Sequence, residues 1–261
     1  MMRYNVENAV LNQREGEEFG EEIKELNDKL KKEIQIEAEM LKKSNFPVDD
    51  ECRIDMDKFE GIYSHDIVSR NKGVVVSRED SFKNKNKKEN EFVDPVGELL
   101  EKSKTLSVNH QWLKGRYLAL RTSKFDDYQN GVDELIINVE TSEVIAAVDS
   151  TTDFMSKAET GKINKILKEG ADVTYGLKIR DNKPVLGELA GLPVFIISFK
   201  KKETIELAKK VADQINPEEE GKKLLDSLIK QAEMFSRSAS SKMRPKYEKA
   251  LKEFQDLKKD M

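Results

Sequence analysis

The chain has 261 residues, which allows either one large domain or a core of about 100 to 150 residues with appendages. Charged and hydrophobic residues each make up 37% of it, and the apolar share lies below the roughly 45–50% of globular chains, a reference that also counts glycine. The 46 basic and 50 acidic residues give a net charge of −4, which excludes a uniformly basic nucleic-acid-binding surface. Any contact with nucleic acid would therefore need a local basic patch.

The chain has too few cysteines and histidines for a disulfide framework or a zinc site of these residues. A single cysteine, Cys52, excludes an intramolecular disulfide, and with only His65 and His110 a zinc site of cysteine and histidine is not expected. No apolar run approaches the ~18 residues of a membrane span, and the N-terminus has no apolar signal segment. We expect Cys52 to be a buried or idle thiol, the protein to be cytoplasmic, and no membrane to be bound.

Residues 1–45 are predicted to form an N-terminal charged helix, best defined over 17–43. Its apolar residues recur every three or four positions, namely Phe19, Ile23, Leu26, Leu30, Ile34 and Leu41. Glu33 and Glu37 occupy the next seam positions after Leu30, which disfavours a sustained coiled coil. The stripe favours packing on its own chain or self-association over recognition of a foreign protein partner.

Residues 46–94 have a different composition. Phe46-Pro47 ends the helix, Gly73-Val74-Val75-Val76 is a short β-prone piece, and residues 83–88 are polar and lysine-rich. This pattern predicts a linker with a short hairpin at most. The lysine run is expected to be a solvated loop, with phosphate contact as the alternative.

Residues 95–200 alternate between helical and strand patterns. Asp94-Pro95 reads as a cap followed by proline at the first helical position. The polar residues 140–142 join two strand patterns closely enough for a hairpin. The predicted order is a helix from 95 to about 106, strands at 117–120, 132–139 and 144–149, a helix at 154–168, and strands at 173–179 and 192–199. This order predicts an α+β (or α/β) core with a mixed sheet, followed at 201–261 by a C-terminal helical segment.

Two acids stand at the ends of neighbouring predicted strands. Asp133 lies at the start of the second strand and Asp149 lies at the end of the third. Because antiparallel neighbours bring a start and an end to the same sheet edge, the two carboxylates are expected to approach each other there. Such a pair would repel unless a cation lay between them, which indicates a divalent-metal site. The structural alternative is that Asp133 borders an Asn130-Gly131 turn and that Asp149 caps the next helix.

The order helix, three strands, helix, strand, with these two acids, resembles the PD-(D/E)xK nuclease superfamily. Asp133 matches the first acid of that superfamily and Asp149-Ser150-Thr151 stands where its D/E-x-K element would be. The resemblance implies that Asp133 and Asp149 bind Mg or Mn, that a backbone carbonyl after the second acid is a further ligand, and that Glu98 or Glu101 assists from the preceding helix.

The sequence departs from that pattern at Thr151, because threonine cannot carry the positive charge that would stabilise a hydroxide or a developing phosphorane. Members of the superfamily can supply this charge from another element. Lys157 on the following helix and Lys178 on the next strand are the candidates, and Lys178 is favoured because its strand could run beside the third one.

A nuclease also needs basic surface, and the sequence offers two local sources. Residues 235–247 carry four basic residues and no acid, and residues 200–202 are three lysines. The candidate nucleic-acid-binding residues are Lys200, Lys201, Arg237, Lys242, Arg244 and Lys246. A flexible loop between helices is the simpler explanation of the first group.

The sequence thus suggests a metal-dependent nuclease, or a nuclease-fold protein that binds DNA or RNA without cutting it. The competing hypothesis is a non-enzymatic helical interaction or scaffold protein whose core is catalytically inactive. Acyl transfer and nucleotide hydrolysis lack their motifs, since neither a GxSxG sequence nor a phosphate-binding loop is present.

Overall fold

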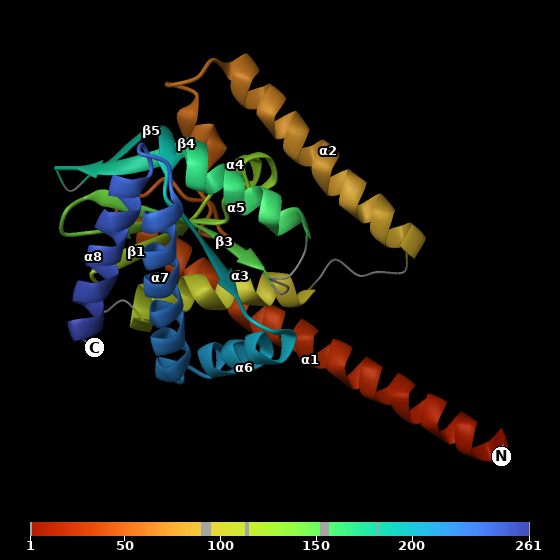
Figure 1. Ribbon diagram of the computed structural model, residues 1–261. Helices are drawn as coiled ribbons and strands as arrows, with labels where there is room; N and C mark the ends of the chain where they lie inside the picture. Colours follow the sequence, from red (N-terminus) through yellow and green to blue (C-terminus); the bar gives the residue numbers. More distant parts are fainter. Residues whose placement is uncertain (1, 90–94, 113–114, 152–156, 182, 261) are drawn as a thin grey trace.

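A mixed four-stranded sheet lies at the centre of the molecule, in the order β1-β2-β3-β6 (Figure 1). Its strands are β1 (Tyr117–Arg121), β2 (Glu134–Asn138), β3 (Glu143–Thr151) and β6 (Val194–Ser198). The first three pair antiparallel, whereas β6 pairs parallel to β3. The computed structural model describes residues 2–89, 95–112, 115–151, 157–181 and 183–260. The expected α+β class with a mixed sheet is confirmed.

Two helices flank the sheet in chain order, α3 (Pro95–Ser107) before β1 and α5 (Lys157–Glu169) after β3. Between α5 and β6 the chain forms a separate hairpin of β4 (Ala171–Arg180) and β5 (Lys183–Leu192). The sequence predicted β4 and most of β6 but not β5, because Pro184, Gly187 and Gly191 are turn-forming residues. Gly187 of β5 pairs with Gly176 of β4. A Cβ on Gly176 would lie 2.6 Å from Leu189, so close packing explains the glycine inside β4.

Both edges of the central sheet are covered by other parts of the chain. Gln231 accepts a hydrogen bond from the Ile196 N–H at 2.9 Å and donates one to the Ile196 carbonyl at 2.8 Å, which satisfies the backbone groups of Ile196 on the free edge of β6. At the other edge, residues 52–54 run beside β1. The Ile54 N–H donates to the Arg121 carbonyl at 2.9 Å, and the Arg121 N–H donates to the Cys52 carbonyl at 3.2 Å.

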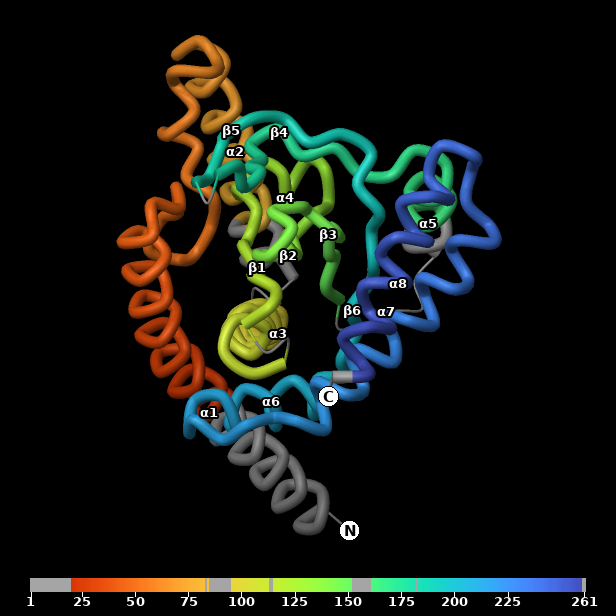
Figure 2. Tube along the Cα trace, turned by 90° about the vertical axis from the view of Figure 1, so that its left-hand side faces the viewer, coloured from red at the N-terminus to blue at the C-terminus, as the bar shows by residue number. Residues whose placement is uncertain are grey.

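Helix α1 (Met2–Lys43) packs against α3 and α6 (Lys201–Ala212), so its apolar stripe is used within the chain. Figure 2 shows α1 on one side of the sheet and the α7 and α8 pair on the other. The buried residues of the stripe are Ile23, Leu26, Leu30, Ile34, Ala38 and Leu41. Glu37, one of the acids that interrupt the seam, is also buried and accepts a hydrogen bond from Asn109 Nδ2 at 2.7 Å.

Glu37 also pairs with His110, whose Nε2 lies 3.0 Å from the Glu37 carboxylate. His110 belongs to a π-helical turn, η2 (Val108–Trp112), which the sequence did not predict. The hydrogen bond to Glu37 raises the pKa of His110 against an opposing effect of burial. The contact therefore couples the charge state of His110 to the attachment of α1.

We expect the stability contribution of His110 to be fully present below its unfolded pKa of about 6.5 and to be lost as pH rises through its higher folded-state pKa. Denaturant midpoints across this pH range should show a decline that His110→Gln removes. The difference between the two proteins isolates His110 from other groups that titrate there. His65→Gln, at an exposed site, should keep the decline, and a decline that persists in His110→Gln would contradict the assignment.

The segment predicted as a linker is instead folded. It contains the short helix η1 (Met56–Phe59) and the helix α2 (His65–Glu89). The β-prone Gly73–Val76 lies inside α2, so the hairpin prediction was wrong. Val68, Asn71 and Val75 are buried at spacings of three and four, which shows that packing of one helical face overrode the β-propensity of the valines. The prediction for the lysine-rich residues 83–88 falls on side chains that lie mostly outside those described.

A short helix, α4 (Lys124–Asn130), occupies the region expected to be a turn. Ser123 accepts a hydrogen bond from the Asp126 N–H at 3.1 Å and so caps the helix, and Gly131 ends it with a φ of +63°. The Asp126 carboxylate accepts hydrogen bonds from the backbone N–H groups of Thr174 at 2.6 Å and Tyr175 at 3.0 Å. Asp126 therefore ties α4 to β4 rather than facing the end of the sheet.

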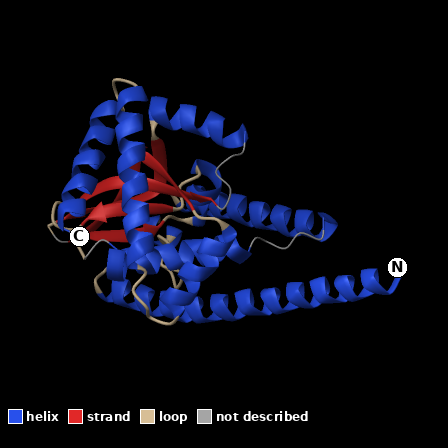
Figure 3. Cartoon of the chain, turned by 60° about the horizontal axis from the view of Figure 1, so that its bottom comes forward, coloured by secondary structure: helices blue, strands red, loops and turns tan. Residues whose placement is uncertain are grey.

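The C-terminal helices α7 (Glu218–Ser238) and α8 (Arg244–Asp260) form a pair beside the sheet (Figure 3). Phe195 of β6 contacts the rings of Phe235, Tyr247 and Phe254 from this pair. The hydrophobic cluster extends from Ile23 to Leu257, so the terminal helices share the core of the sheet. Within the described residues, no helix is long and apolar enough to cross a membrane.

Candidate active site at the end of strand β3

Asp133 reaches the end of β3, as the sequence predicted. The Asp133 N–H donates to the Val148 carbonyl at 2.8 Å, and the Asp133 carboxylate accepts a hydrogen bond from the Ser150 N–H at 2.6 Å. The carboxylate thus continues the hydrogen bonding between β2 and β3 beyond the start of β2. Burial raises the pKa of Asp133 to about 8, and the charges of Glu101 and Asp149 add to that rise.

Asp149 and Ser150 face opposite sides of the sheet, because successive residues of a strand alternate. Asp149 Oδ2 lies 2.5 Å from Lys162 Nζ of α5. Ser150 Oγ lies 2.5 Å from Lys104 Nζ of α3. One lysine from each flanking helix therefore meets the end of β3, on either side of the strand.

Lys104 is a functional candidate that the sequence reasoning missed. Its side chain is 1% exposed, and its Nζ lies 3.3 Å from Glu134 Oε2, also 1% exposed. Thr105 Oγ1 donates to the other Glu134 oxygen at 2.6 Å. The signal was available, since Lys104 lies four residues after the buried Leu100 and so on the apolar face of α3.

The two helper candidates on α3 are held by other charges. Glu98 pairs with Lys102 at 2.6 Å. Glu101 pairs with Arg53 at 3.0 Å and also with Arg121, and these arginines lower the pKa of Glu101 against the effect of burial. The charge of Glu101 adds to the raised pKa of Asp133, so Glu101 is the better candidate for the helper acid.

Arg53 is a second residue that the sequence reasoning missed. It is buried, and its Nη1 lies 3.1 Å from Asp127 Oδ2 in addition to its contact with Glu101. It comes from the stretch beside β1 that was predicted to be a linker. Residues 52–54 therefore complete both the edge of the sheet and the charged cluster behind Asp133.

Lys178, the lysine favoured to replace the charge missing at Thr151, lies away from this site. Lys178 is exposed on β4 and borders a cavity with Glu143 and Val144, at the start of β3. Asp149 lies six residues further along the strand, about 20 Å away at the usual rise. Lys178 is thus at the wrong end of β3. Lys157 is the first residue of α5, and its side chain lies outside those described.

The basic residues are split between the two ends of β6. Lys200 and Lys201 follow β6 and begin α6, next to the end of β3. Lys246 donates to the Gly191 carbonyl at 2.5 Å, before β6 begins. The other candidates, Arg237, Lys242 and Arg244, are exposed around the connection of α7 and α8. The expected joint basic surface is therefore divided, and only Lys200 and Lys201 lie near the acids.

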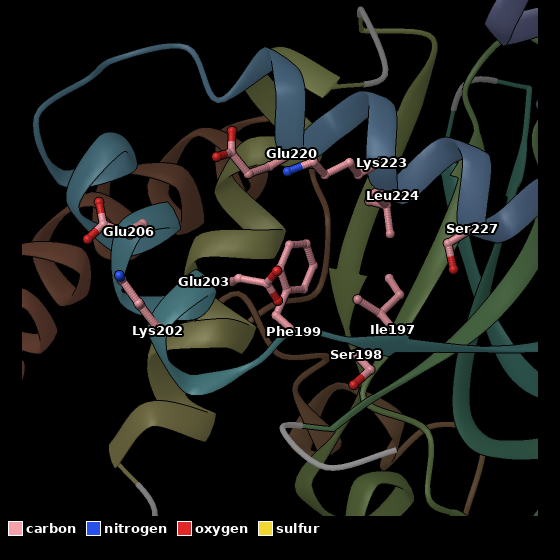
Figure 4. A pocket seen from close by; sticks show the side chains of 10 residues that line it. All are labelled: Ile197, Ser198, Phe199, Lys202, Glu203, Glu206, Glu220, Lys223, Leu224 and Ser227. Carbon is pink, nitrogen blue, oxygen red and sulfur yellow. The ribbon is translucent and has the colours of Figure 1, made fainter. Parts of the chain in front are cut away.

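A cavity of about 360 Å³ lies beside the end of β6, between α6 and α7 (Figure 4). Ile197 of β6, Phe199 just after that strand and Leu224 of α7 provide its apolar lining. Its charged residues are Lys202, Glu203, Glu206, Glu220 and Lys223. The mixed signs select neither an anion nor a cation, and Asp133, Asp149 and Lys104 do not line this cavity.

The acids at the end of β3 suit a hard cation in donor type but are few. No group of three or more His, Cys, Asp or Glu residues placed to hold a metal occurs in the described part of the chain. Asp133 and Asp149 supply two carboxylates, and Mg²⁺ is commonly held by one or two carboxylates with water and substrate phosphate completing its shell. Two oxygen-donor groups therefore fit a Mg²⁺ site that the substrate completes.

Compared with protein-family models, with curated proteins and with solved structures, the chain gives no match. Its function must therefore be inferred from the residues of the site.

Proposed function

We propose that the protein is a divalent-metal-dependent nuclease whose site lies at the end of β3. The observation that carries the proposal is the meeting of Asp133 and the buried Lys104 at Ser150, with Asp149 next along β3 and close enough to raise the pKa of Asp133. The strand order β1-β2-β3-β6, with α3 before it and α5 between β3 and β6, supports a relationship to the PD-(D/E)xK superfamily. Lys104 is the cation that this proposal assigns in place of Thr151.

In this proposal Asp133 and Asp149 hold the cation, together with the backbone carbonyl of Ser150. A bound Mg²⁺ or Mn²⁺ would supply Lewis-acid stabilisation of the phosphate and a more acidic water. Lys104, which is buried and held in place by Glu134, would stabilise the negative charge that develops on the substrate phosphate beside Ser150. Glu101, paired with Arg53 and Arg121, contributes to the net charge around Asp133. Lys200 and Lys201 offer contacts to substrate phosphates at the same end of the sheet.

A second function, nucleic-acid binding without cleavage, is favoured by one observation. Asp149 is already neutralised by Lys162, and Glu101 is neutralised by two arginines, as expected of a nuclease fold that no longer needs a metal. A cytoplasmic setting is likewise a proposal, consistent with the buried free thiol of Cys52.

We expect Mg²⁺ or Mn²⁺ to stabilise the wild-type protein, by about 2.7 kcal/mol at a hundredfold excess over Kd. Asp133→Asn and Asp149→Asn should abolish that response, measured by thermal unfolding with and without the metal. The same variants should lose cleavage of single- and double-stranded DNA and RNA.

The matched control is Asp213→Asn, an exposed acid after α6 that should keep both responses. A metal response without cleavage, lost in the two site variants, would favour the binding-only function. An equal metal response in all four proteins would refute the metal site.

A further inference from the structure

A second cavity adjoins Asp149 through Lys162. It has a volume of about 120 Å³, several times the ~10–15 Å³ that a single water needs, which leaves room for a small oxyanion. We call it the α5 cavity. It is lined by Asn130, Gly131, Lys162, Lys165, Ile166, Glu169, Gly170, Ala171, Asp172 and Val194.

Two lysines one turn apart on α5 face this cavity. Lys162 Nζ lies 3.1 Å from where a Cβ on Gly131 would stand, so the missing side chain of Gly131 makes room for the ammonium group. Lys162 is shared with the site, because the same Nζ bonds Asp149 at 2.5 Å. Lys165 has no ion-pair partner in the portion of the chain that the structure describes.

The two acids of the cavity are partly engaged elsewhere. Glu169 lies 3.4 Å from Lys168, and Asp172 accepts a hydrogen bond from the Gly191 N–H at 2.7 Å. With Lys162 held by Asp149, the cavity has no excess of positive charge. Once Asp149 is neutralised in another way, the charge of Lys162 becomes available beside that of Lys165.

We propose that the α5 cavity binds a phosphate group and that Asp149 controls it by holding or releasing Lys162. The proposal rests on the proposed nuclease function for its natural ligand, a phosphodiester next to the one attacked. A divalent cation on Asp149 would release Lys162 to that phosphate, so the cation and the phosphate should each strengthen binding of the other. The cavity itself can be tested without any metal.

The test uses the full chain and inorganic phosphate as the probe, with binding followed by ³¹P NMR in the absence of divalent metal. Asp149→Asn removes the carboxylate that holds Lys162, and we expect it to raise phosphate affinity about tenfold, within the usual range of coupling between sites. Adding Lys162→Gln to that variant should abolish the gain. Lys165→Gln should weaken binding, whereas Lys252→Gln, which removes an exposed charge from α8, should leave it unchanged.

Unchanged phosphate affinity in Asp149→Asn would overturn the proposal. So would a loss in Lys165→Gln no larger than the loss in Lys252→Gln, since Lys165 is exposed and its replacement should not affect folding. A gain in Asp149→Asn that depends on Lys162, in a protein that shows no response to Mg²⁺, would uphold the cavity while refuting the proposed metal site.

Discussion

Replacing Lys104 by methionine should destabilise the protein by about 3–5 kcal/mol, because it leaves the buried carboxylate of Glu134 without its partner. Glu134→Gln should be costly for the converse reason. The double variant Lys104→Met/Glu134→Gln removes both charges and keeps an acceptor for Thr105, so most of the stability should return. Denaturant unfolding of the four proteins measures these differences.

The double variant also separates structure from chemistry. We expect the double variant to fold but to have lost cleavage. Among the described residues, Lys104 is the one whose ammonium group contacts Ser150. Cleavage at the wild-type rate in this folded variant would remove Lys104 from the proposed site. A double variant whose loss of stability equals the sum of the two single losses would show that the two side chains are not energetically coupled.

Arg53→Met should destabilise the protein by about 3 kcal/mol, because Asp127 loses its ion-pair partner and Glu101 keeps only Arg121. The matched control is Arg70→Met, at an exposed position of α2, where a change within about 0.5 kcal/mol is expected. Urea denaturation of both variants provides the comparison.

Arg53→Met/Asp127→Asn should recover part of the loss, since it removes the unpaired carboxylate as well. Equal stability of Arg53→Met and Arg70→Met would mean that residues 52–54 contribute only backbone pairing to the sheet edge. The comparison shows whether the ion pairs of Arg53, from the segment predicted to be a linker, contribute to the free energy of unfolding.

Local sequence patterns were sufficient to locate a helix or strand wherever its buried apolar residues recur at a regular spacing. The period of Ile23, Leu26 and Leu30 located the N-terminal helix, and the apolar runs around Leu135 and Ala146 located two central strands. Asp133 and Asp149 could be brought to one sheet end by chain order alone, because the start and the end of antiparallel neighbours coincide. The acids of the candidate site were therefore found from the sequence.

The cations of the site were not found, because charge partners are set by packing between distant segments. Lys104 meets Ser150 across 46 positions, and Arg53 meets Asp127 across 74. Helix α2 was missed because valine favours strands, whereas the burial of Val68 and Val75 on one helical face favours a helix there.

The sequence by itself thus determined the N-terminal helix, the central strands β1, β2 and β3 with helices α3 and α5, and the pair of acids, since all of these depend on residues close together in the chain. Tertiary structure decided that Lys162 pairs with Asp149, that Lys104 reaches Ser150, that Lys178 lies at the other end of β3, and that the segment before α3 completes the sheet edge. Each of these depends on contacts between residues far apart in the sequence, which no local periodicity encodes.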